Sequence, residues 1–491
     1  MGIYQIISIG LYMLLMLGIG LYAYRKSTSN VDEFLLGGRK MGAAVTALSA
    51  GAADMSGWLL MGLPGAMFVS GISASWIAIG LTIGAYLNYV LVAPSLRVYT
   101  EKAQNAITIP DFFEKRFRDS SKMLRFISGA VILVFFTLYT SAGMVSGGKL
   151  FESAFGMDYT SGLWLTSSVV VIYTFLGGFL AVSLTDFVQG TIMVLALVLV
   201  PIVVIVNLGG VGPAFETIHL KDTKYLSLFR GTTTIGIISL LAWGLGYFGQ
   251  PHILVRFMAI DTVKQLRSAK KIGITWMVFT VAGAMLVGLV GIAYMSNYNL
   301  TIADPETIFI FFSKTLFHPL IGGFLLSAIL AAVMSTISSQ LLVTSSSLTE
   351  DFYKAFLRRG ASQNELLLIS RLSVFAVALV SLLLSLNPKE SILELVGHAW
   401  AGFGSAFGPL ILLSLLWRGI SRNGAVAGML VGGITVLAWV YLDHPYKDLY
   451  SMIPGFLLSM LSIVAVSKFS GPAQEIQTEF DAVKKELKEN Y

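Results

Sequence analysis

The chain contains thirteen long apolar segments, and this feature limits its possible folds more than any other. A helix that crosses the roughly 30 Å hydrocarbon core of a bilayer needs about 20 apolar residues. Only helices and closed barrels satisfy backbone polar groups in lipid, and such long apolar runs lack the alternating pattern of a barrel. We therefore predict an all-α membrane protein with transmembrane helices at 3–24, 41–70, 75–96, 124–155, 163–182, 186–208, 235–257, 272–295, 320–353, 366–386, 392–417, 424–442 and 452–467.

The positions of the basic residues predict how the chain is oriented. Cytoplasmic loops are enriched in Lys and Arg. With the N-terminus outside, 26 of the 33 basic residues fall in inside loops or at the adjoining helix ends, among them Arg256. We expect a multi-pass cell-membrane protein with its N-terminus outside and its C-terminus in the cytoplasm. The same distribution explains the net charge of +6 by topology rather than by binding of nucleic acid.

The chain divides into one transmembrane domain, residues 1–470, and a tail, residues 471–491. The tail is rich in Glu and Lys, and its apolar residues Ile476, Phe480, Val483 and Leu487 have helical spacing. Either a solvated cytoplasmic helix or a partner-binding helix explains this pattern. Nothing in the sequence points to an obligate protein partner.

Two predicted spans are interrupted by residues that break helices. The second reads TALSAGAADMSGW at 46–58, and the seventh reads WGLGYFGQP at 243–251. Each opens a block of five spans, 41–208 and 235–417, of similar length and opposite orientation. Paired interruptions at corresponding positions of two halves are typical of transporters with inverted repeats. We predict an inverted five-plus-five helix repeat whose discontinuous helices, broken at 52–57 and 244–251, line a transport site.

Polar groups inside the spans supply a candidate ion site. Asp54 lies in the first interruption, and a mid-membrane carboxylate costs about 2.5–3.5 kcal/mol on insertion scales. It either serves transport or pairs with backbone N–H groups freed by the break. The ninth span carries Ala332, Ser335 and Thr336. Their oxygens suit a hard cation such as sodium, unless the hydroxyls only bond to carbonyls of their own helix.

Other polar and aromatic candidates each allow two interpretations. Asp186, at the expected start of the sixth span, is an ion-exit carboxylate or a helix N-cap acid. Glu394 and His398 form a proton relay or an interfacial pair. Membrane aromatics mostly pack or form interfacial belts, but unwound backbone in a membrane lines a cavity or is buried in protein. Four aromatic residues fall within or beside the interruptions: Trp58, Tyr139, Trp243 and Tyr247.

No enzyme motif is present in the chain. The sequence has no HExxH, no Walker loop and no Gly-x-Ser-x-Gly elbow, which argues against an enzyme and against a nucleotide-driven pump. A transporter-like membrane sensor would normally carry a signalling domain, and a channel would need a repeated filter sequence. The paired interruptions favour a secondary transporter over both.

Four segments resemble the sodium:solute symporter family. They are LSAGAADMSGWLLMGLPG at 48–65, YTFLGGFLA at 173–181, GLGYFGQPH at 244–252 and SAILAAVMST at 327–336. The second is typical of the whole family, and the others are closer to its proline-transporting branch. The resemblance covers nearly the whole chain and implies a thirteen-helix fold with an inverted-repeat core. Ala53 departs from the serine of the proline branch, which bears on sodium affinity without touching the implied ligands.

The resemblance also implies the residues of the site. The sodium ligands would be the backbone oxygens of Ala52, Met55 and Ala332 and the hydroxyls of Ser335 and Thr336. The positions that matter for sodium and substrate would be Asp54, Ser56 and Gly57. The proline pocket would involve Trp58, Tyr139, Trp243, Tyr247 and Pro251. The charged positions linked to sodium coupling would be Arg39 and Asp186.

The resemblance implies sodium-coupled uptake of L-proline by alternating access. Sodium would bind between the second and ninth spans, and the carboxylate of proline would face the N-terminal amides of a half-helix. Two alternatives stay open at this point. The substrate is another small zwitterion or carboxylate, or the coupling ion is a proton.

Overall fold

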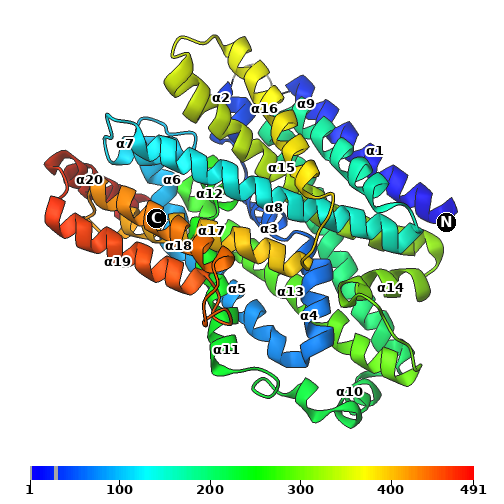
Figure 1. Ribbon diagram of the computed structural model, residues 1–491. Helices are drawn as coiled ribbons and strands as arrows, with labels where there is room; N and C mark the ends of the chain where they lie inside the picture. Colours follow the sequence, from blue (N-terminus) through cyan, green and yellow to red (C-terminus); the bar gives the residue numbers. More distant parts are fainter. Residues whose placement is uncertain (1–2, 27–30) are drawn as a thin grey trace.

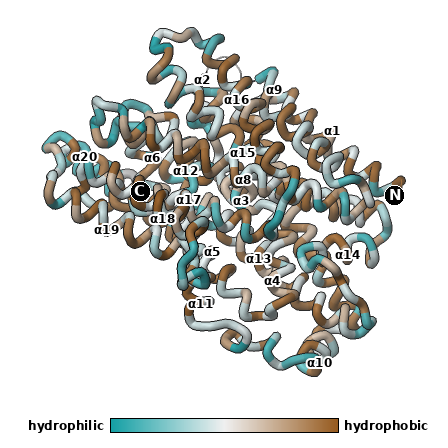
Figure 2. The backbone as a smooth tube through the Cα atoms, viewed as in Figure 1, coloured by the Kyte–Doolittle hydropathy of each residue, from teal (hydrophilic) through white to brown (hydrophobic). Residues whose placement is uncertain are grey.

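The chain folds into a bundle of long apolar helices. The computed structural model describes residues 3–26 and 31–491, and no strand occurs within them. Ten of the described helical segments are long and apolar enough to cross a membrane. Figure 2 shows hydrophobic residues along the helices and hydrophilic ones gathered near α2 and α20. The protein is therefore an all-α, multi-span membrane protein, as predicted.

The helices follow one another along the chain with short connections. The first half contains α1 (Ile3–Lys26), α2 (Val31–Leu36), α3 (Ala43–Asp54), α4 (Leu63–Ser70), α5 (Ser75–Leu87), α6 (Ala93–Lys102), α7 (Ile109–Arg116), α8 (Met123–Phe155), α9 (Tyr159–Asn207) and α10 (Val211–Lys221). The second half contains α11 (Thr234–Leu241), α12 (Pro251–Ala259), α13 (Leu266–Asn297), α14 (Ile308–Thr315), α15 (Pro319–Ser346), α16 (Gln363–Leu384), α17 (Ile392–Leu416), α18 (Arg422–Tyr441), α19 (Met452–Ser470) and α20 (Gln474–Asn490).

Short 3₁₀ and π segments join several of these helices. The 3₁₀ segments are η1 (Gly37–Arg39), η3 (Gly71–Ala74), η5 (Thr223–Leu226), η6 (Ala242–Gly249), η7 (Val263–Gln265) and η8 (Pro305–Thr307). The π segments are η2 (Trp58–Gly62), η4 (Asn88–Val92) and η9 (Ser347–Leu357). Such irregular turns inside helices often mark functional positions.

Burial separates the helices of the core from those at the periphery. In the most apolar stretch of 18 residues, 83% of the residues are buried both in α15 with η9 and in α17. The corresponding share is 28% in α1 and 33% in α19. Figure 1 shows α1 beside α9 on one flank and α18 beside α19 on the other. Exposed Ile, Leu and Phe side chains on the flanking helices suit contact with lipid.

The break predicted in the second span is present. α3 ends at Asp54, Met55 leaves the helical conformation (φ −79°, ψ 77°), and winding resumes in η2 and α4. The last carbonyls of a helix have no partner within it. Here the Asp54 carbonyl accepts bonds from the Ser56 N–H (2.9 Å) and the Trp58 indole N–H (3.2 Å).

The break predicted in the seventh span is also present. α11 passes into the 3₁₀ segment η6, Gln250 is extended (φ −86°, ψ 105°), and α12 starts at Pro251. Proline at the first helical position suits the start of a helix, because its missing N–H would have no partner there. The indole N–H of Trp400 on α17 donates to the Trp243 carbonyl at 2.8 Å and so holds the 3₁₀ segment.

The boundary between the fifth and sixth predicted spans lies elsewhere than expected. α9 runs over 49 residues, and its only non-helical residue is Gly178, at φ 53° and ψ −144°. A Cβ at Gly178 would lie 2.5 Å from Cδ2 of Phe34, so both the backbone and the packing require glycine. The boundary predicted at 183–185 was wrong, and these residues lie within the helix.

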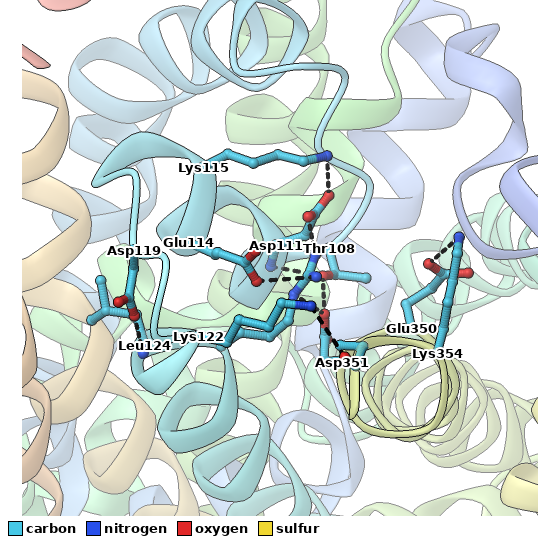
Figure 3. A network of polar contacts seen from close by, with 12 residues as sticks. Thr108, Asp111, Glu114, Lys115, Asp119, Lys122, Leu124, Glu350, Asp351 and Lys354 are labelled. Atoms are coloured by element: carbon cyan, nitrogen blue, oxygen red, sulfur yellow. Dashed lines mark hydrogen bonds and ion pairs between the residues drawn. The ribbon is translucent and has the colours of Figure 1, made fainter. Parts of the chain in front are cut away.

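A charged network ties α7, α8 and η9 together at one end of the bundle. Arg125 pairs with Asp111, with Glu114 at 3.1 Å and with Asp351 at 3.3 Å. Figure 3 shows these three carboxylates turned toward a common centre. Thr108 also donates to Asp351 at 2.9 Å. Because η9 continues directly from α15, this network anchors the end of that central helix.

The tail folds as α20 and packs on the same end of the bundle. Its residues Ile476, Phe480 and Val483 are buried, so the interpretation as a fully solvated helix was wrong. Its charged face makes ion pairs with α6, with the loop after α7 and with the loop before α18: Lys102–Glu486, Arg118–Glu475, Arg118–Glu479 and Arg418–Asp481.

Candidate functional site

Four of the five predicted sodium-ligand residues meet where α3 ends beside α15. The Ser335 hydroxyl donates to the Ala52 carbonyl at 2.7 Å and lies 3.0 Å from the Ala332 carbonyl. Thr336 Oγ1 lies 3.2 Å from the same Ala332 carbonyl. All four residues are buried. The Met55 carbonyl follows directly after the end of α3, so it is not part of a regular helix.

The hydroxyl cluster makes bonds within its own helix and one bond across to α3. Thr336 bonds to the carbonyl four residues back, as hydroxyls in membrane helices commonly do. Ser335 bonds within its own helix and also across to α3. A neutral set of carbonyl and hydroxyl oxygens results, which suits a monovalent hard cation. No group of three or more His, Asp or Glu side chains suited to a metal occurs among residues 3–26 and 31–491.

The Asp54 carboxylate faces the second broken helix. Tyr247, on η6, donates its phenol O–H to Oδ2 of Asp54. Oδ1 has no hydrogen-bond partner in the described part of the chain. Both side chains are buried. The alternative in which backbone N–H groups of the break satisfy this carboxylate was therefore wrong, and a phenol from the other repeat takes their place.

A small cavity lies against this carboxylate. It measures about 30 Å³ and is lined by residues that include Asp54, Met55, Asn88, Tyr247 and Trp276. A volume of this size holds about one or two water molecules. An amino acid therefore enters this region only when the surrounding helices move apart.

The other predicted pocket residues do not line one common cavity. Trp243 stacks on Tyr450 with centroids 5.2 Å apart and lines a separate hollow of about 370 Å³. The Tyr139 ring lies 6.0 Å from that of His252, next to the start of α12 at Pro251. Only Tyr247, of the aromatic candidates, lines the cavity at Asp54.

Three predicted residues lie in the first break or directly after it. Trp58 is buried and bonds to the Asp54 carbonyl. Ser56 is buried beside it. Gly57 packs so closely on α8 that a Cβ there would lie 2.3 Å from Oγ of Ser146. This contact fixes the unwound backbone against a neighbouring helix.

Asp186 is not a helix N-cap, because it lies inside α9 and is buried. Its Oδ2 accepts from the Ser49 hydroxyl at 2.7 Å and from Arg256 Nη2 at 3.2 Å. Arg256 lies in the last turn of α12, near the helix end where the sequence placed it, but its side chain is buried. Sequence reasoning missed this arginine. The sequence did contain one signal for it. Pro251 favours the start of a new helix, so residue 256 would lie more than one turn inside that half-helix.

The remaining charged candidates lie outside this cluster. Arg39 donates to the carbonyls of Met258 (2.6 Å) and Ala106 (2.7 Å), where it holds the end of α12. Glu394 caps its own helix through Ser391. His398 lies 3.2 Å from Glu390. Neither the relay nor the pair expected between Glu394 and His398 is formed.

Comparison with known proteins identifies the family. The sequence model of the sodium:solute symporter family matches residues 34–432. The chain belongs to this family. It is 59% identical over 490 residues to the osmoregulated proline transporter of Bacillus subtilis (strain 168), covering 99% of each chain. It is 54% identical to sodium/proline symporter 2 of Staphylococcus saprophyticus, over 98% of this chain and 96% of that one.

Solved structures share the fold of this sodium:solute symporter. A Na⁺-coupled sialic acid symporter, in a substrate-bound outward-open state, matches with a TM-score of 0.82 at 20% identity over 96% of this chain and 99% of that chain. Mhp1, a nucleobase-cation-symport-1 family transporter in a closed conformation, matches with a TM-score of 0.57 at 13% identity, over 93% and 99%. The chain is a transporter and not an enzyme.

Proposed function

We propose that this chain is a symporter that takes up L-proline together with sodium across the cell membrane by alternating access. Relatives that are 54–59% identical over nearly their full length are named for proline transport or for sodium/proline symport. Identity of this extent supports the same substrate and the same coupling ion. The single observation that carries the sodium part is the 2.7 Å contact between Ser335 Oγ and the Ala52 carbonyl.

The proposed topology has thirteen spans with the N-terminus outside and the C-terminus in the cytoplasm. Ten segments are long enough to cross a membrane. Division of two of them, at Gly71 and at Gly178, gives twelve crossings. The shorter run formed by α11, η6 and α12 adds the thirteenth. The inverted repeats are residues 41–208 and 235–417, within a transmembrane domain of residues 1–470. The tail, residues 471–491, then lies on the cytoplasmic side.

Sodium would bind between the first break and α15. Its ligands would be the carbonyls of Ala52, Met55 and Ala332 and the hydroxyls of Ser335 and Thr336. With sodium bound, the Ser335 O–H turns away from the Ala52 carbonyl, because both oxygens then face the cation. Replacement of the hydrogen bond between Ser335 and Ala52 by contacts to sodium would order the backbone that follows Ala52. That backbone leads directly to Asp54.

Proline would bind between the two breaks. Tyr247 and Asp54 line the cavity there, and Ser56, Gly57, Trp58, Tyr139, Trp243 and Pro251 match the pocket of the proline branch. Opening of the halves would enlarge the cavity enough to admit the ring. The residues that link sodium to this movement would be Asp54, Asp186 and Arg39, which lie in or next to the moving segments α3, α9 and α12.

The energetics of one sodium ion per cycle are sufficient for uptake. A tenfold sodium gradient with a potential of 100 mV supplies about 3.7 kcal/mol. This supports accumulation of proline by a factor of about several hundred.

Uptake of radiolabelled proline by proteoliposomes tests the proposal. An inward sodium gradient should drive accumulation, a potassium gradient of equal ionic strength should not, and an inward proton gradient without sodium should not. Unlabelled proline should compete, and glycine betaine and acetate should not. Uptake that is indifferent to sodium, or that is driven by protons alone, would refute the coupling. Competition by betaine as strong as by proline would refute the substrate.

A further inference from the structure

We propose that Asn88 and Asp54 share a buried water-binding site, and that Asn88 holds the Asp54 carboxylate in place through this water. The inference rests on the proposed sodium symport, in which Asp54 links the ion to the movement of the helices. It adds to that function a positioning residue on a helix that carries none of the predicted site residues.

Asn88 is a buried amide without a polar partner. It lies where α5 passes into the π segment η4, and it is 1% exposed. Neither Oδ1 nor Nδ2 makes a hydrogen bond within the described part of the chain. Burial of an amide without hydrogen bonds costs about 1–3 kcal/mol by protein mutational data. In folded proteins such groups nearly always bond to the protein or to an ordered water.

Asn88 lines the same cavity as Asp54. This space measures about 30 Å³, and Tyr89 lines it as well. Gly273 on α13 leaves room for the Tyr89 hydroxyl, because a Cβ there would lie 2.8 Å from Oη. The residues around this one space carry polar atoms with no partner among the described residues: Oδ1 of Asp54, Oδ1 and Nδ2 of Asn88, and Oη of Tyr89.

The cavity has the size and the polar groups that a water site needs. A water molecule requires about 10–15 Å³ of such volume and two to four polar partners. The space of about 30 Å³ meets the first condition, and the unpartnered atoms of Asp54, Asn88 and Tyr89 meet the second. No hydrogen bond joins Asn88 directly to Asp54. A molecule between them is therefore needed to satisfy both side chains.

A water at this place connects a donor to an acceptor. Nδ2 of Asn88 donates to the water oxygen, and the water donates one O–H to Oδ1 of Asp54. The Tyr247 phenol donates to Oδ2 of the same carboxylate. The carboxylate is then held from two sides, by η6 through Tyr247 and by η4 through Asn88. Hydrogen bonds to an ionised acceptor are roughly twice as strong as neutral ones, so the arrangement suits a charged Asp54.

The bridge holds the carboxylate only while the cavity is closed. Asp54 ends α3, which also carries the candidate sodium ligand Ala52. Asn88 instead follows α5, which packs against η6. Movement of α3 relative to α5 would widen the space, separate Asp54 from Asn88 and break the bridge. Asn88 therefore acts on transport through Asp54 and is not itself a ligand of sodium.

Two substitutions at position 88 separate hydrogen bonding from packing. Asn88→Leu keeps the branched shape and removes both polar atoms, so the rate of proline uptake at saturating sodium should fall about tenfold. Asn88→Ser keeps a polar group and leaves space for a further water, so the rate should stay within about threefold of that of the unaltered protein. Equal losses in Asn88→Leu and Asn88→Ser would overturn the inference.

Thr82→Val is a matched control on the same helix. It removes a hydroxyl that bonds to the Ala78 carbonyl at 2.8 Å and does not line the cavity, so uptake should not change. A loss in Thr82→Val as large as in Asn88→Leu would show a general sensitivity of α5 and would overturn the inference.

Combination with Tyr247→Phe shows whether Asn88 acts through Asp54. Residues that act as a unit have effects that do not multiply. Either single loss already frees the carboxylate, so Tyr247→Phe with Asn88→Leu should lower uptake by about ten- to thirtyfold. A loss of about a hundredfold, the product of the two single effects, would mean that Asn88 only packs and would overturn the inference.

Direct observation of the water does not depend on the folding of any variant. An experimental structure of the unaltered protein, at a resolution that shows ordered waters, should contain one within hydrogen-bond distance of Asp54 Oδ1 and Asn88. A dry cavity would overturn the inference and leave sodium symport intact. Absence of sodium-driven proline uptake in the unaltered protein would instead refute the proposed function, whether or not the water is bound.

Discussion

Replacement of Ser335 by alanine tests the candidate sodium site most directly. The hydroxyl lies 2.7 Å from the Ala52 carbonyl and 3.0 Å from the Ala332 carbonyl, so it is one of the oxygens that would face the ion. A hydrogen bond or ligand contact to a charged group contributes about 1.5–3 kcal/mol. We therefore expect the sodium concentration for half-maximal uptake to rise by about 10- to 150-fold.

The same substitution should leave proline binding intact once sodium is saturating. Ser335 bonds to the carbonyl of Ala52 rather than to Asp54, and it does not line the cavity at Asp54. The half-maximal proline concentration should therefore rise at low sodium and return to that of the unaltered protein at high sodium. Initial rates of labelled proline uptake, measured over a matrix of sodium and proline concentrations, separate the two effects.

Ser327→Ala is a matched control for this experiment. Ser327 lies on the same helix, is equally buried, and bonds only to the carbonyl of Gly323 at 3.0 Å. Its loss removes a hydroxyl from α15 without touching α3. If Ser327→Ala shifts the sodium dependence as much as Ser335→Ala does, the oxygen site is not at Ser335 and the reasoning is refuted.

Three further predictions concern the breaks and the tail. Gly178→Ala should lower the stability of the protein by about 3 kcal/mol through strain and the clash with Phe34; thermal unfolding measures this, and Gly10→Ala, with nothing within 4 Å of its Cβ, should have little effect. Tyr247→Phe removes the hydrogen bond to Asp54 and should reduce uptake by about tenfold. Tyr89→Phe, in the same cavity, removes a hydroxyl without a partner among the described residues and should be milder, so equal losses would contradict a role for the bond. Phe480→Ala should weaken the docking of α20 by about 3 kcal/mol and speed hydrogen exchange over 474–490, whereas exchange as slow as in the exposed control Thr478→Ala would show that Phe480 does not hold the helix.

The sequence predicted the breaks because their causes are local. Asp54–Gly57 and Gly249–Pro251 contain residues that weaken or end a helix wherever they occur. The spans were predictable for a similar reason, because the length and apolarity of a segment are also local properties of the sequence. α9 departs from helical conformation at Gly178 and not at 183–185, and the Phe34 side chain that packs against Gly178 is remote in sequence.

The separation of Trp243 from Tyr247 had a different cause. The family resemblance placed both rings in one pocket, and in an α-helix residues four apart would indeed share a face. η6 is a 3₁₀ segment with about three residues per turn, so residues four apart diverge by about 120°. Trp243 therefore meets Tyr450, while Tyr247 reaches Asp54 and packs edge-on against Trp400.

The burial of Arg256 was not predicted, because loop-charge reasoning considers only the distance to a helix end. α12 is a half-helix of nine residues, and all nine are buried. A basic residue near its end is therefore inside the protein rather than at the membrane surface. Asp186 gave the complementary signal, since a buried carboxylate requires a partner, but the sequence does not show which of the 33 basic residues folds against it.

The two breaks are held in different ways, and this difference indicates which one responds to an ion. The second is fixed by close backbone packing: a Cβ at Gly84 on α5 would lie 2.1 Å from the Gly244 carbonyl oxygen. The Trp400 N–H further holds it at the Trp243 carbonyl. The first is also packed closely, at Gly57, but the helix before it carries an Ala52 carbonyl whose partner is the rotatable hydroxyl of Ser335. An ion that replaces this one bond changes the first break without disturbing the second. The break after α3 is therefore the one through which sodium would act on the substrate cavity.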